Sequence, residues 1–285
     1  MKFSEKIRGL ANTEGFRVIT VGSGAPPIDI ERVSPCTMIQ YKDMMFPVDL
    51  GYGSARRMFE MGISPSSIDN VMFTHLHSDH SLDYGYFMIM GWHDGRRKLH
   101  TIGPKGVEKM HNLYTEMYDK DISYRANLGI SLKGIKEDVT FTELVGGETF
   151  ELEGIKISTC KVPHTAYTVS YKFEADGKKV VVSGDLMYCE EFIDFVKDAD
   201  VIVFDANQAN SVFLENRGPK FVANLEKSHA TIEQIAEMAK KAGAKSIVLT
   251  HVTPGVYVGD MIAKVSAIYK GEIIPAYDTM AIDIQ

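Results

Sequence analysis

The chain of 285 residues is long enough for one large α/β domain or two modest ones. Hydrophobic residues make up 45% of it and charged residues 24%, which is typical of a globular protein with a full core. The formal net charge of −7 argues against nucleic acid as a partner, because proteins that bind it usually present a basic face. Three scattered cysteines, Cys36, Cys160 and Cys189, exclude a disulfide framework and a thiolate zinc cage.

We expect no targeting or membrane signal in this sequence. The opening residues, MKFSEKIRGLANTEGF, contain no apolar stretch of the kind that forms a secretory signal. The longest apolar run, YGYFMIMGW at 84–92, is too short to span a bilayer. No repeat or low-complexity linker divides the sequence. We therefore expect one cytoplasmic domain over residues 1–285 that makes no contact with a membrane.

Short apolar runs that end in polar residues predict the strands. Each run has four or five apolar, largely β-branched residues, as expected of strands buried on both faces. In chain order they are FRVITVGSG (16–24), VMFTHLH (71–77), KKVVVSGD (178–185), ADVIVFDAN (199–207) and KSIVLTH (245–251). Helical patterns lie between some of these runs, so the sequence predicts an α/β sandwich.

Two helices and one hairpin are predicted within this pattern. A short helix is expected over 53–64, where Gly62 and Pro65 stop it. A longer one is expected over 231–245, with one apolar stripe and Gly243 where a C-terminal cap belongs. Residues 165–184 predict a hairpin with its turn at Asp176-Gly177.

Other polar groups are assigned to the surface. Arg96, Arg97 and Lys98 form the densest basic run and are expected in a solvated turn. Three histidines that belong to no motif are also expected on the surface or in turns: His93, His100 and His111.

The segment THLHSDH at 74–80 holds three of the nine histidines of the chain and one aspartate. In an extended segment alternate side chains face the same way, so His75 and His77 are expected to bind one cation. Asp79 and His80, beyond the turn, would face a second one. Imidazole and carboxylate are good ligands for zinc, but a zinc site needs about four of them.

The remaining ligands are expected from segments far along the chain. KVPH ends at His164, VVSGD at Asp185 and IVLTH at His251. A carboxylate has two oxygens and can bridge two cations, whereas a histidine nitrogen cannot, so Asp185 is the predicted bridge. The ligands of the first metal are then His75, His77 and His164, and those of the second are Asp79, His80 and His251.

The order His-x-His-x-Asp-His, then His, then Asp after Ser-Gly, then His after Leu-Thr resembles the metallo-β-lactamase superfamily. Asp49 in FPVDLGYG completes the motif set of that family, and we expect it to orient a ligand or loop rather than bind metal. The resemblance runs from VGSGAPP to AYDTMAIDI. It implies an αββα four-layer sandwich of two mixed β-sheets flanked by helices. It also implies two divalent metal ions, with zinc expected and manganese or iron as alternatives.

Further segments resemble the ribonuclease Z and arylsulfatase-like branch, among them GISPSSIDNVMFTHLHSDH and SHATIEQIAEMAKKAGAKSIVLTH. In that branch a histidine of a His-x-Thr segment contacts the scissile phosphate, and His229 matches it. The resemblance thus implies that His229 binds the substrate and takes part in catalysis. Where the branch has His-Glu-Ala-Thr, this chain reads Phe204-Asp205-Ala206-Asn207, which makes Asp205 a candidate to orient His229.

The ligand set predicts metal-assisted hydrolysis. Two neighbouring cations can hold a bridging hydroxide, because they lower the pKa of bound water towards roughly 7. Asp79 would bind metal through one oxygen and handle a proton with the other. The branch's true ribonuclease Z enzymes grip tRNA with a long basic arm, and between His164 and Asp185 there is room only for a hairpin. We therefore expect a small anionic ester, namely a phosphodiester, phosphonate or sulfate ester, rather than tRNA or other RNA.

Several alternatives stay open. They are a ribonuclease Z-type RNA 3′-end endonuclease, a lactone or thioester hydrolase of the same fold, an iron-dependent oxidoreductase and a non-catalytic binding protein. The last is disfavoured because none of the seven ligands is missing. A homodimer is also possible, since relatives in this branch are commonly dimers.

Overall fold

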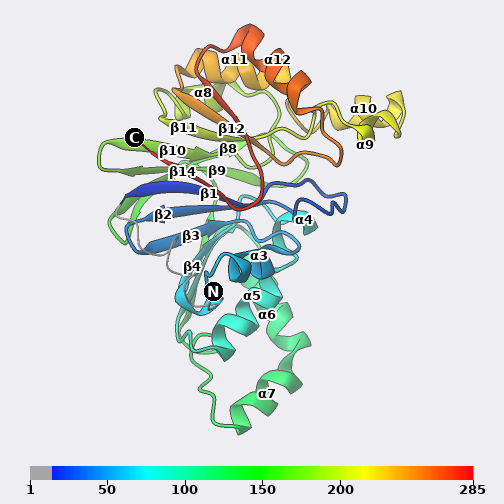
Figure 1. Ribbon diagram of the computed structural model, residues 1–285. Helices are drawn as coiled ribbons and strands as arrows, with labels where there is room; N and C mark the ends of the chain where they lie inside the picture. The colour runs from blue at the N-terminus through cyan, green and yellow to red at the C-terminus, as the bar shows by residue number, and fades with distance from the viewer. Residues whose placement is uncertain (1–14, 285) are drawn as a thin grey trace, which may run out of the picture.

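Two seven-stranded mixed sheets pack face to face in the computed structural model, which describes residues 15–284 (Figure 1). The first sheet has the order β14 (Met280–Asp283), β1 (Phe16–Gly22), β2 (Cys36–Tyr41), β3 (Met44–Val48), β4 (Asn70–Met72), β5 (Leu99–Pro104), β6 (Val139–Leu144). The second has the order β13 (Glu272–Pro275), β12 (Ser246–Thr250), β11 (Val201–Asp205), β10 (Lys178–Val182), β9 (Thr168–Ala175), β8 (Ile155–Val162), β7 (Thr149–Leu152). The expected lack of a secretory signal concerns residues 1–14, which lie outside the described residues.

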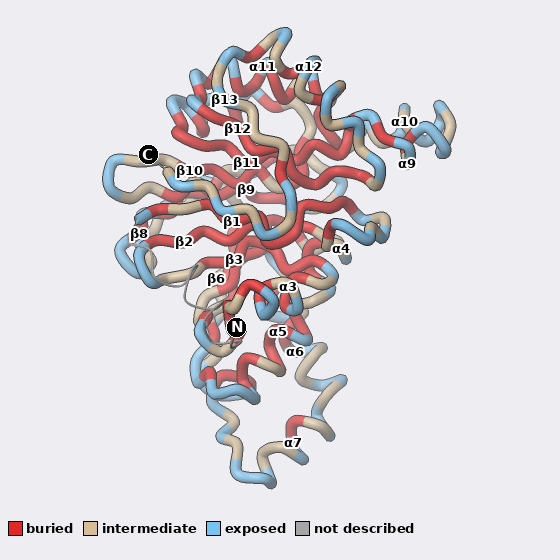
Figure 2. The backbone as a smooth tube through the Cα atoms, viewed as in Figure 1, coloured by how far each residue is buried: buried red, intermediate tan, exposed pale blue. Residues whose placement is uncertain are grey.

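Helices cover the outer face of each sheet. Those of the first half of the chain are α3 (Ser54–Glu60), η1 (Pro65–Ser67), α4 (Ser78–Ser81), α5 (Tyr84–His93), α6 (Val107–Met117) and α7 (Asp119–Asn127). Those of the second half are α8 (Glu190–Phe195), α11 (Ile232–Ala242) and α12 (Val258–Ile268), while α9 (Val212–Glu215) and α10 (Pro219–Leu225) project from the body of the molecule (Figure 1). Three apolar clusters fill the spaces between the layers, as the buried strands of Figure 2 indicate. The predicted αββα sandwich is therefore confirmed.

The strands are buried on both faces, as their composition predicts. In β11 Val201 and Val203 point into the cluster between the sheets, whereas Ile202 and Phe204 belong to the cluster beneath α8 and α11. Alternate residues of one strand thus stabilise two different layers. A polar side chain inside such a strand would be desolvated on either face at a cost in free energy. The polar side chains of these segments therefore lie at the strand ends.

The two predicted helices and the hairpin are also confirmed. α11 begins at a capping box formed by Thr231 and Gln234 and ends at Gly243, whose φ of 68° is the left-handed cap conformation. The 53–64 helix is α3. Strands β9 and β10 pair antiparallel across the turn at Asp176 and Gly177, where both φ angles are positive, as a tight hairpin turn requires.

Two surface assignments are wrong. Arg96 is buried, donates to the carbonyl of Met88 at 2.8 Å and lies over the ring of Phe87. His111 is also buried, between the hydroxyl of Tyr84 at 2.8 Å and a backbone carbonyl. Both belong to the layer that α5 and α6 build on the first sheet, and charge density along the sequence carries no information about that packing. His100 is half-buried, and His93 is exposed as expected.

The topology gathers strand ends at one edge of the molecule. Strands β10, β11 and β12 are parallel neighbours, so their carboxyl ends lie together. Strands β3 and β4 do the same in the first sheet. Two hydrogen bonds tie the sheets at this edge, from Tyr171 Oη to the carbonyl of Phe73 at 2.8 Å and from the amide of Val169 to the carbonyl of Thr74 at 2.9 Å. This edge is where the predicted site residues fall.

A search of residues 15–284 found no helix with both the length and the apolar character needed to cross a membrane.

Candidate metal centre

The seven predicted ligands meet at this edge in two groups that share one carboxylate. Within each group the candidate donor atoms all lie within 4.8 Å of one another. The first group is His75, His77, His164 and Asp185; the second is Asp79, His80, Asp185 and His251. These are the two sets expected from the sequence, with the same shared residue.

In the first group the histidine nitrogens have the spacing of ligands around one ion. His77 Nδ1 lies 3.1 Å from His75 Nε2 and 3.3 Å from His164 Nε2. Asp185 Oδ2 lies 3.8 Å from His75 Nε2 and 3.7 Å from His164 Nε2. Two nitrogens bound tetrahedrally to zinc, each about 2.0–2.1 Å from the ion, are roughly 3.3 Å apart. The group therefore has the dimensions of a zinc site.

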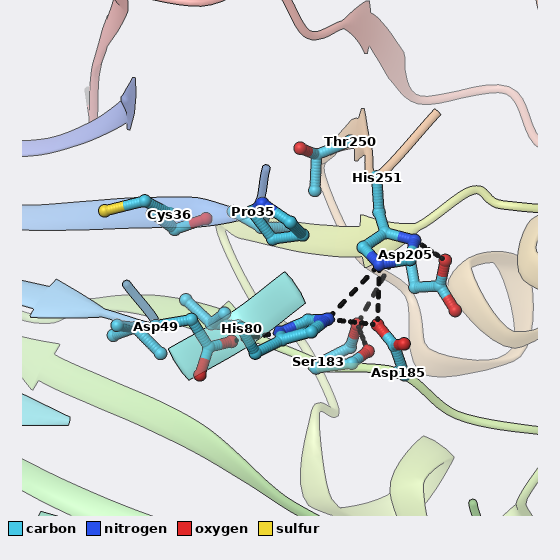
Figure 3. A pocket seen from close by; sticks show the side chains of 14 residues that line it. Pro35, Cys36, Asp49, His80, Ser183, Asp185, Asp205, Thr250 and His251 are labelled. Atoms are coloured by element: carbon cyan, nitrogen blue, oxygen red, sulfur yellow. Dashed lines mark hydrogen bonds and ion pairs between the residues drawn. The ribbon is translucent and has the colours of Figure 1, made fainter. Parts of the chain in front are cut away.

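The second group has similar spacing, and Figure 3 shows its members His80, Asp185 and His251 turned towards one another. His80 Nε2 and His251 Nε2 are 3.2 Å apart, and Asp79 Oδ2 lies 3.4 Å from the former and 3.2 Å from the latter. Asp185 Oδ1 is 3.3 Å from His80 Nε2 and 3.5 Å from His251 Nε2. Asp185 thus turns one oxygen towards each group, which is the arrangement expected of a bridging ligand.

A single turn of helix explains why neighbouring residues belong to different groups. His75 and His77 are extended, and His77 is the N-cap of α4. Asp79 and His80 lie in that turn, which rotates them to the other side. The amide of Leu50 donates to the carbonyl of His80 at 2.7 Å and holds the turn against the end of β3.

The backbone at the site takes conformations that most residues avoid. Asp49 and His251 both have positive φ, 65° and 58°. Such conformations cost of order 1–3 kcal/mol each and persist where the surroundings enforce them. Gly184 also has positive φ, and a Cβ there would lie 2.7 Å from Cβ of Thr74. Glycine is therefore required at position 184, next to Asp185.

Asp49 contacts His80 directly and His75 through Thr74, on the side of each ring away from the centre. Its Oδ2 accepts hydrogen bonds of 2.8 Å from His80 Nδ1 and from the hydroxyl of Thr74. That hydroxyl lies 3.0 Å from His75 Nδ1 and, because its own hydrogen is donated to Asp49, it can only accept a hydrogen bond from that nitrogen. These contacts fix the tautomers of both rings, so that Nε2 of His75 and of His80 presents a lone pair to the centre.

Asp205 holds a second pair of histidines. Its Oδ1 is 3.1 Å from His251 Nδ1, and its Oδ2 accepts a hydrogen bond of 2.5 Å from His229 Nδ1. His229 is therefore placed beside the centre, 4.0 Å from Asp185 by its Nδ1. Its Nε2 makes no hydrogen bond to any described residue. The carboxylate in the altered Phe-Asp-Ala-Asn stretch thus contacts both a predicted ligand and the predicted substrate-binding histidine.

Sequence reasoning missed three partners of the ligands. The carbonyl of Ser228 accepts from His164 Nδ1 at 2.8 Å, and the side-chain amide of Asn207 lies 3.0 Å from His251 Nδ1. The third is Thr74. A backbone carbonyl leaves no trace in residue type, so Ser228 could not have been found. Asn207 and Thr74 could have been, since each lies within two residues of a predicted site residue.

The charges fit two divalent cations. Four carboxylates lie largely out of water around the centre: Asp49, Asp79, Asp185 and Asp205. Asp185 Oδ1 is buried without a hydrogen-bond donor, which costs free energy unless a cation offsets it. Burial disfavours a charged His80, yet the carboxylates of Asp185 and Asp49 raise its pKa to about 10. Without metal, a proton on His80 offsets part of this negative charge; with metal, the four carboxylates carry the charge that two divalent ions would balance.

Asp49→Asn is expected to weaken metal binding about 10–100-fold while the fold persists. The amide cannot accept hydrogen bonds through both side-chain atoms, so His75 and His80 lose the contacts that fix their tautomers. Titration with zinc in a competing chelator would measure this loss. Asp200→Asn is the control, because Asp200 is a buried aspartate that accepts a backbone hydrogen bond from Lys179 away from the ligands. Unchanged zinc affinity in Asp49→Asn would contradict the role.

Comparisons with known proteins agree with this geometry. A family model described as a β-lactamase superfamily domain matches residues 54–252. The ribonuclease Z of Mycobacterium marinum (strain ATCC BAA-535 / M) is 25% identical over 250 residues, which cover 86% of this chain and 88% of that protein.

Two solved structures show the same fold. The metallo-β-lactamase fold protein YhfI of Bacillus subtilis aligns with a TM-score of 0.76 at 17% identity, over 95% of this chain and 100% of that one. The short form of human tRNase Z aligns with a TM-score of 0.70 at 18% identity, over 94% of this chain and 99% of that one. With its fold, its two His/Asp groups and a family model that covers more than half of its length, the chain belongs to the metallo-β-lactamase superfamily.

Proposed function

We propose that this protein is a dinuclear metal-dependent hydrolase of small anionic esters, with phosphodiesters as the first choice. The observation that carries the proposal is Asp185, whose two oxygens face two histidine groups of matching dimensions. Two bound cations would lower the pKa of a water molecule and polarise the ester. An anionic ester suits such a centre because its charge is attracted to the cations.

The residues around the centre support the handling of protons. Asp79 uses Oδ2 towards His80 and His251, and its Oδ1 has no partner in the described part of the chain. That oxygen can accept a proton from the attacking water. His229 is held by Asp205 through Nδ1, which leaves Nε2 to contact an ester oxygen. Burial opposes its charge, but the Asp205 carboxylate raises the pKa of His229, so the ring can donate a proton to the leaving oxygen.

The segment between His164 and Asp185 favours a small substrate. It consists of a short connection and the β9–β10 hairpin, which pairs within the second sheet. No long insertion is available there to hold a folded RNA. A ribonuclease remains the second candidate, and the observation that favours it is the ribonuclease Z name of the relatives found by sequence.

A substrate panel tests the proposal. Protein loaded with zinc or manganese is expected to hydrolyse bis(p-nitrophenyl) phosphate. The panel also contains p-nitrophenyl sulfate, a thioester, a lactone and a precursor tRNA with a 3′ trailer, which represent the alternative substrate classes. His77→Ala, which removes a ligand of the first group, should abolish turnover. Cleavage of the precursor tRNA in preference to the diester would support the ribonuclease. Intact esters throughout, or abundant iron with oxygen consumption, would overturn the hydrolase.

A further inference from the structure

The segment that follows His251 runs between two protruding parts of the chain. On one side lies the loop between β1 and β2, since the amide of Ala25 donates to the carbonyl of Val252 at 3.0 Å and the amide of Val252 donates to the carbonyl of Ser23 at 3.0 Å. On the other side lies α9, where the amide of Val212 donates to the carbonyl of Gly255 at 3.0 Å. Both protrusions therefore start within a few residues of a metal ligand.

The β1–β2 loop has a firmly held base. The Asp278 carboxylate accepts hydrogen bonds from the amides of Ser23 and Val33, at 2.9 and 2.8 Å. Arg32 is buried there and donates to the hydroxyl of Ser23 and the carbonyl of Ala276, both at 2.6 Å. These contacts fix the base of the loop where it pairs with Val252, next to the predicted ligand His251.

The tip of this loop is apolar and unusually exposed. Ile28 is 87% exposed and Ile30 is 98% exposed, on a tip that also contains two prolines. Leaving large aliphatic side chains in water forgoes stabilisation of about 1.5–3 kcal/mol each. Exposed apolar side chains gathered at one place mark a surface that binds something apolar.

The opposite protrusion also presents apolar side chains. Val212 of α9 and Phe221 of α10 are 47% and 41% exposed, and Figure 1 shows these two helices projecting from the body of the molecule. The guanidinium of Arg217 lies 4.5 Å from the ring centre of Phe213 and 5.6 Å from that of Phe221, which holds the two rings together. We call Ile28, Ile30, Val212 and Phe221 the apolar rim.

Charge at the rim argues for the kind of ligand. Asp29 and Glu31 alternate with the two isoleucines on the loop tip. They repel a polyanion such as RNA and the surface of an anionic membrane, while an uncharged hydrocarbon group is unaffected. A substrate with its anion at the metal ligands and its apolar part against the rim satisfies both regions.

Resting on the proposed function, we propose that the natural substrate is an anionic ester with an extended alkyl or aryl group, and that the apolar rim binds this group. The rim would then set substrate preference without touching the reacting atoms. Each methylene that leaves water on binding strengthens affinity, by as much as about fourfold when it is fully buried.

Binding of two phosphonates tests this without requiring turnover. Zinc-loaded protein is expected to bind hexylphosphonate at least about 10-fold more tightly than methylphosphonate in calorimetric titrations, because five more methylenes contact the rim. The double variant Ile28→Ser/Ile30→Ser should reduce the ratio below about threefold and leave the affinity for methylphosphonate unchanged. Val212→Ser/Phe221→Ser tests the other side of the rim. Met117→Ser, an exposed apolar residue on α6, is the matched control and should keep the full ratio.

The two proposals fail differently. Equal affinities for both phosphonates in the unaltered protein, or a ratio that the rim variants leave intact, would overturn the role of the rim. Hydrolysis of hexyl p-nitrophenyl phosphate by the same preparation tests the proposed function separately. A preparation that binds hexylphosphonate more tightly but cleaves no ester would support the proposed role of the rim and contradict the proposed hydrolase activity.

Discussion

Asp185→Asn is expected to lower kcat/KM for any ester that the protein hydrolyses by about 10³-fold or more, and to reduce the bound metal from two ions per chain to one or none. The two carboxylate oxygens of Asp185 lie 3.3–3.8 Å from donor nitrogens of both histidine groups. An amide keeps the shape but supplies one neutral oxygen and no charge. Loss of a second cation removes several kcal/mol of transition-state stabilisation, and 1.36 kcal/mol corresponds to a tenfold rate.

Metal analysis and kinetics on the same samples check this result. Asp200→Asn is the matched control, because Asp200 stands at the opposite end of β11 and its carboxylate accepts from Lys245 Nζ and the amide of Lys179, both at 2.7 Å. That variant should keep two ions and full activity. Two ions retained in Asp185→Asn, with activity lowered less than tenfold, would show that the two groups do not depend on a shared ligand.

Several residues of the site could be predicted from the sequence because they follow recognisable strands. An apolar β-branched run that ends in a single His or Asp predicts a buried strand. It also predicts that the side chain of that His or Asp lies at the edge of the sheet where the strand ends. For Asp185, Asp205 and His251 those runs are parallel neighbours in the structure, so their ends meet. The alternation of His75 and His77 and the turn before Asp79 then assign the two groups from backbone geometry alone.

The surroundings of the ligands could not be predicted in the same way. The carbonyl of Ser228 reaches His164 across 64 residues of sequence, a contact made by the segment that follows α10. Arg96 is buried through contacts with α5 that its neighbours in sequence do not reveal. The apolar rim depends on exposure: Ile28 in the sequence is one more aliphatic residue, and only the fold shows that it is 87% exposed, on a loop whose base pairs with Val252 next to His251.

His229→Asn is expected to lower kcat by about 10²–10⁴-fold while the protein still binds two metal ions. Asparagine can still donate to Asp205 Oδ2, so His251, which contacts the other oxygen, stays oriented. What is lost is the ring that would protonate the departing oxygen, and removal of a positioned general acid has this magnitude. Loss of metal from His229→Asn would instead assign His229 a structural role.

The choice of leaving group makes this prediction specific to proton donation. A p-nitrophenolate departs readily without a proton, whereas a phenolate or alkoxide of higher pKa needs one, so the loss in His229→Asn should be at least about tenfold larger for the phenyl ester than for the p-nitrophenyl ester. His100→Gln, a half-buried histidine that bonds to Thr142 on the first sheet, should behave as the unaltered protein with both esters. An equal loss for both leaving groups would mean that His229 binds the ester's charge without transferring a proton. The dependence on leaving group therefore separates the two roles that a histidine in this position can have.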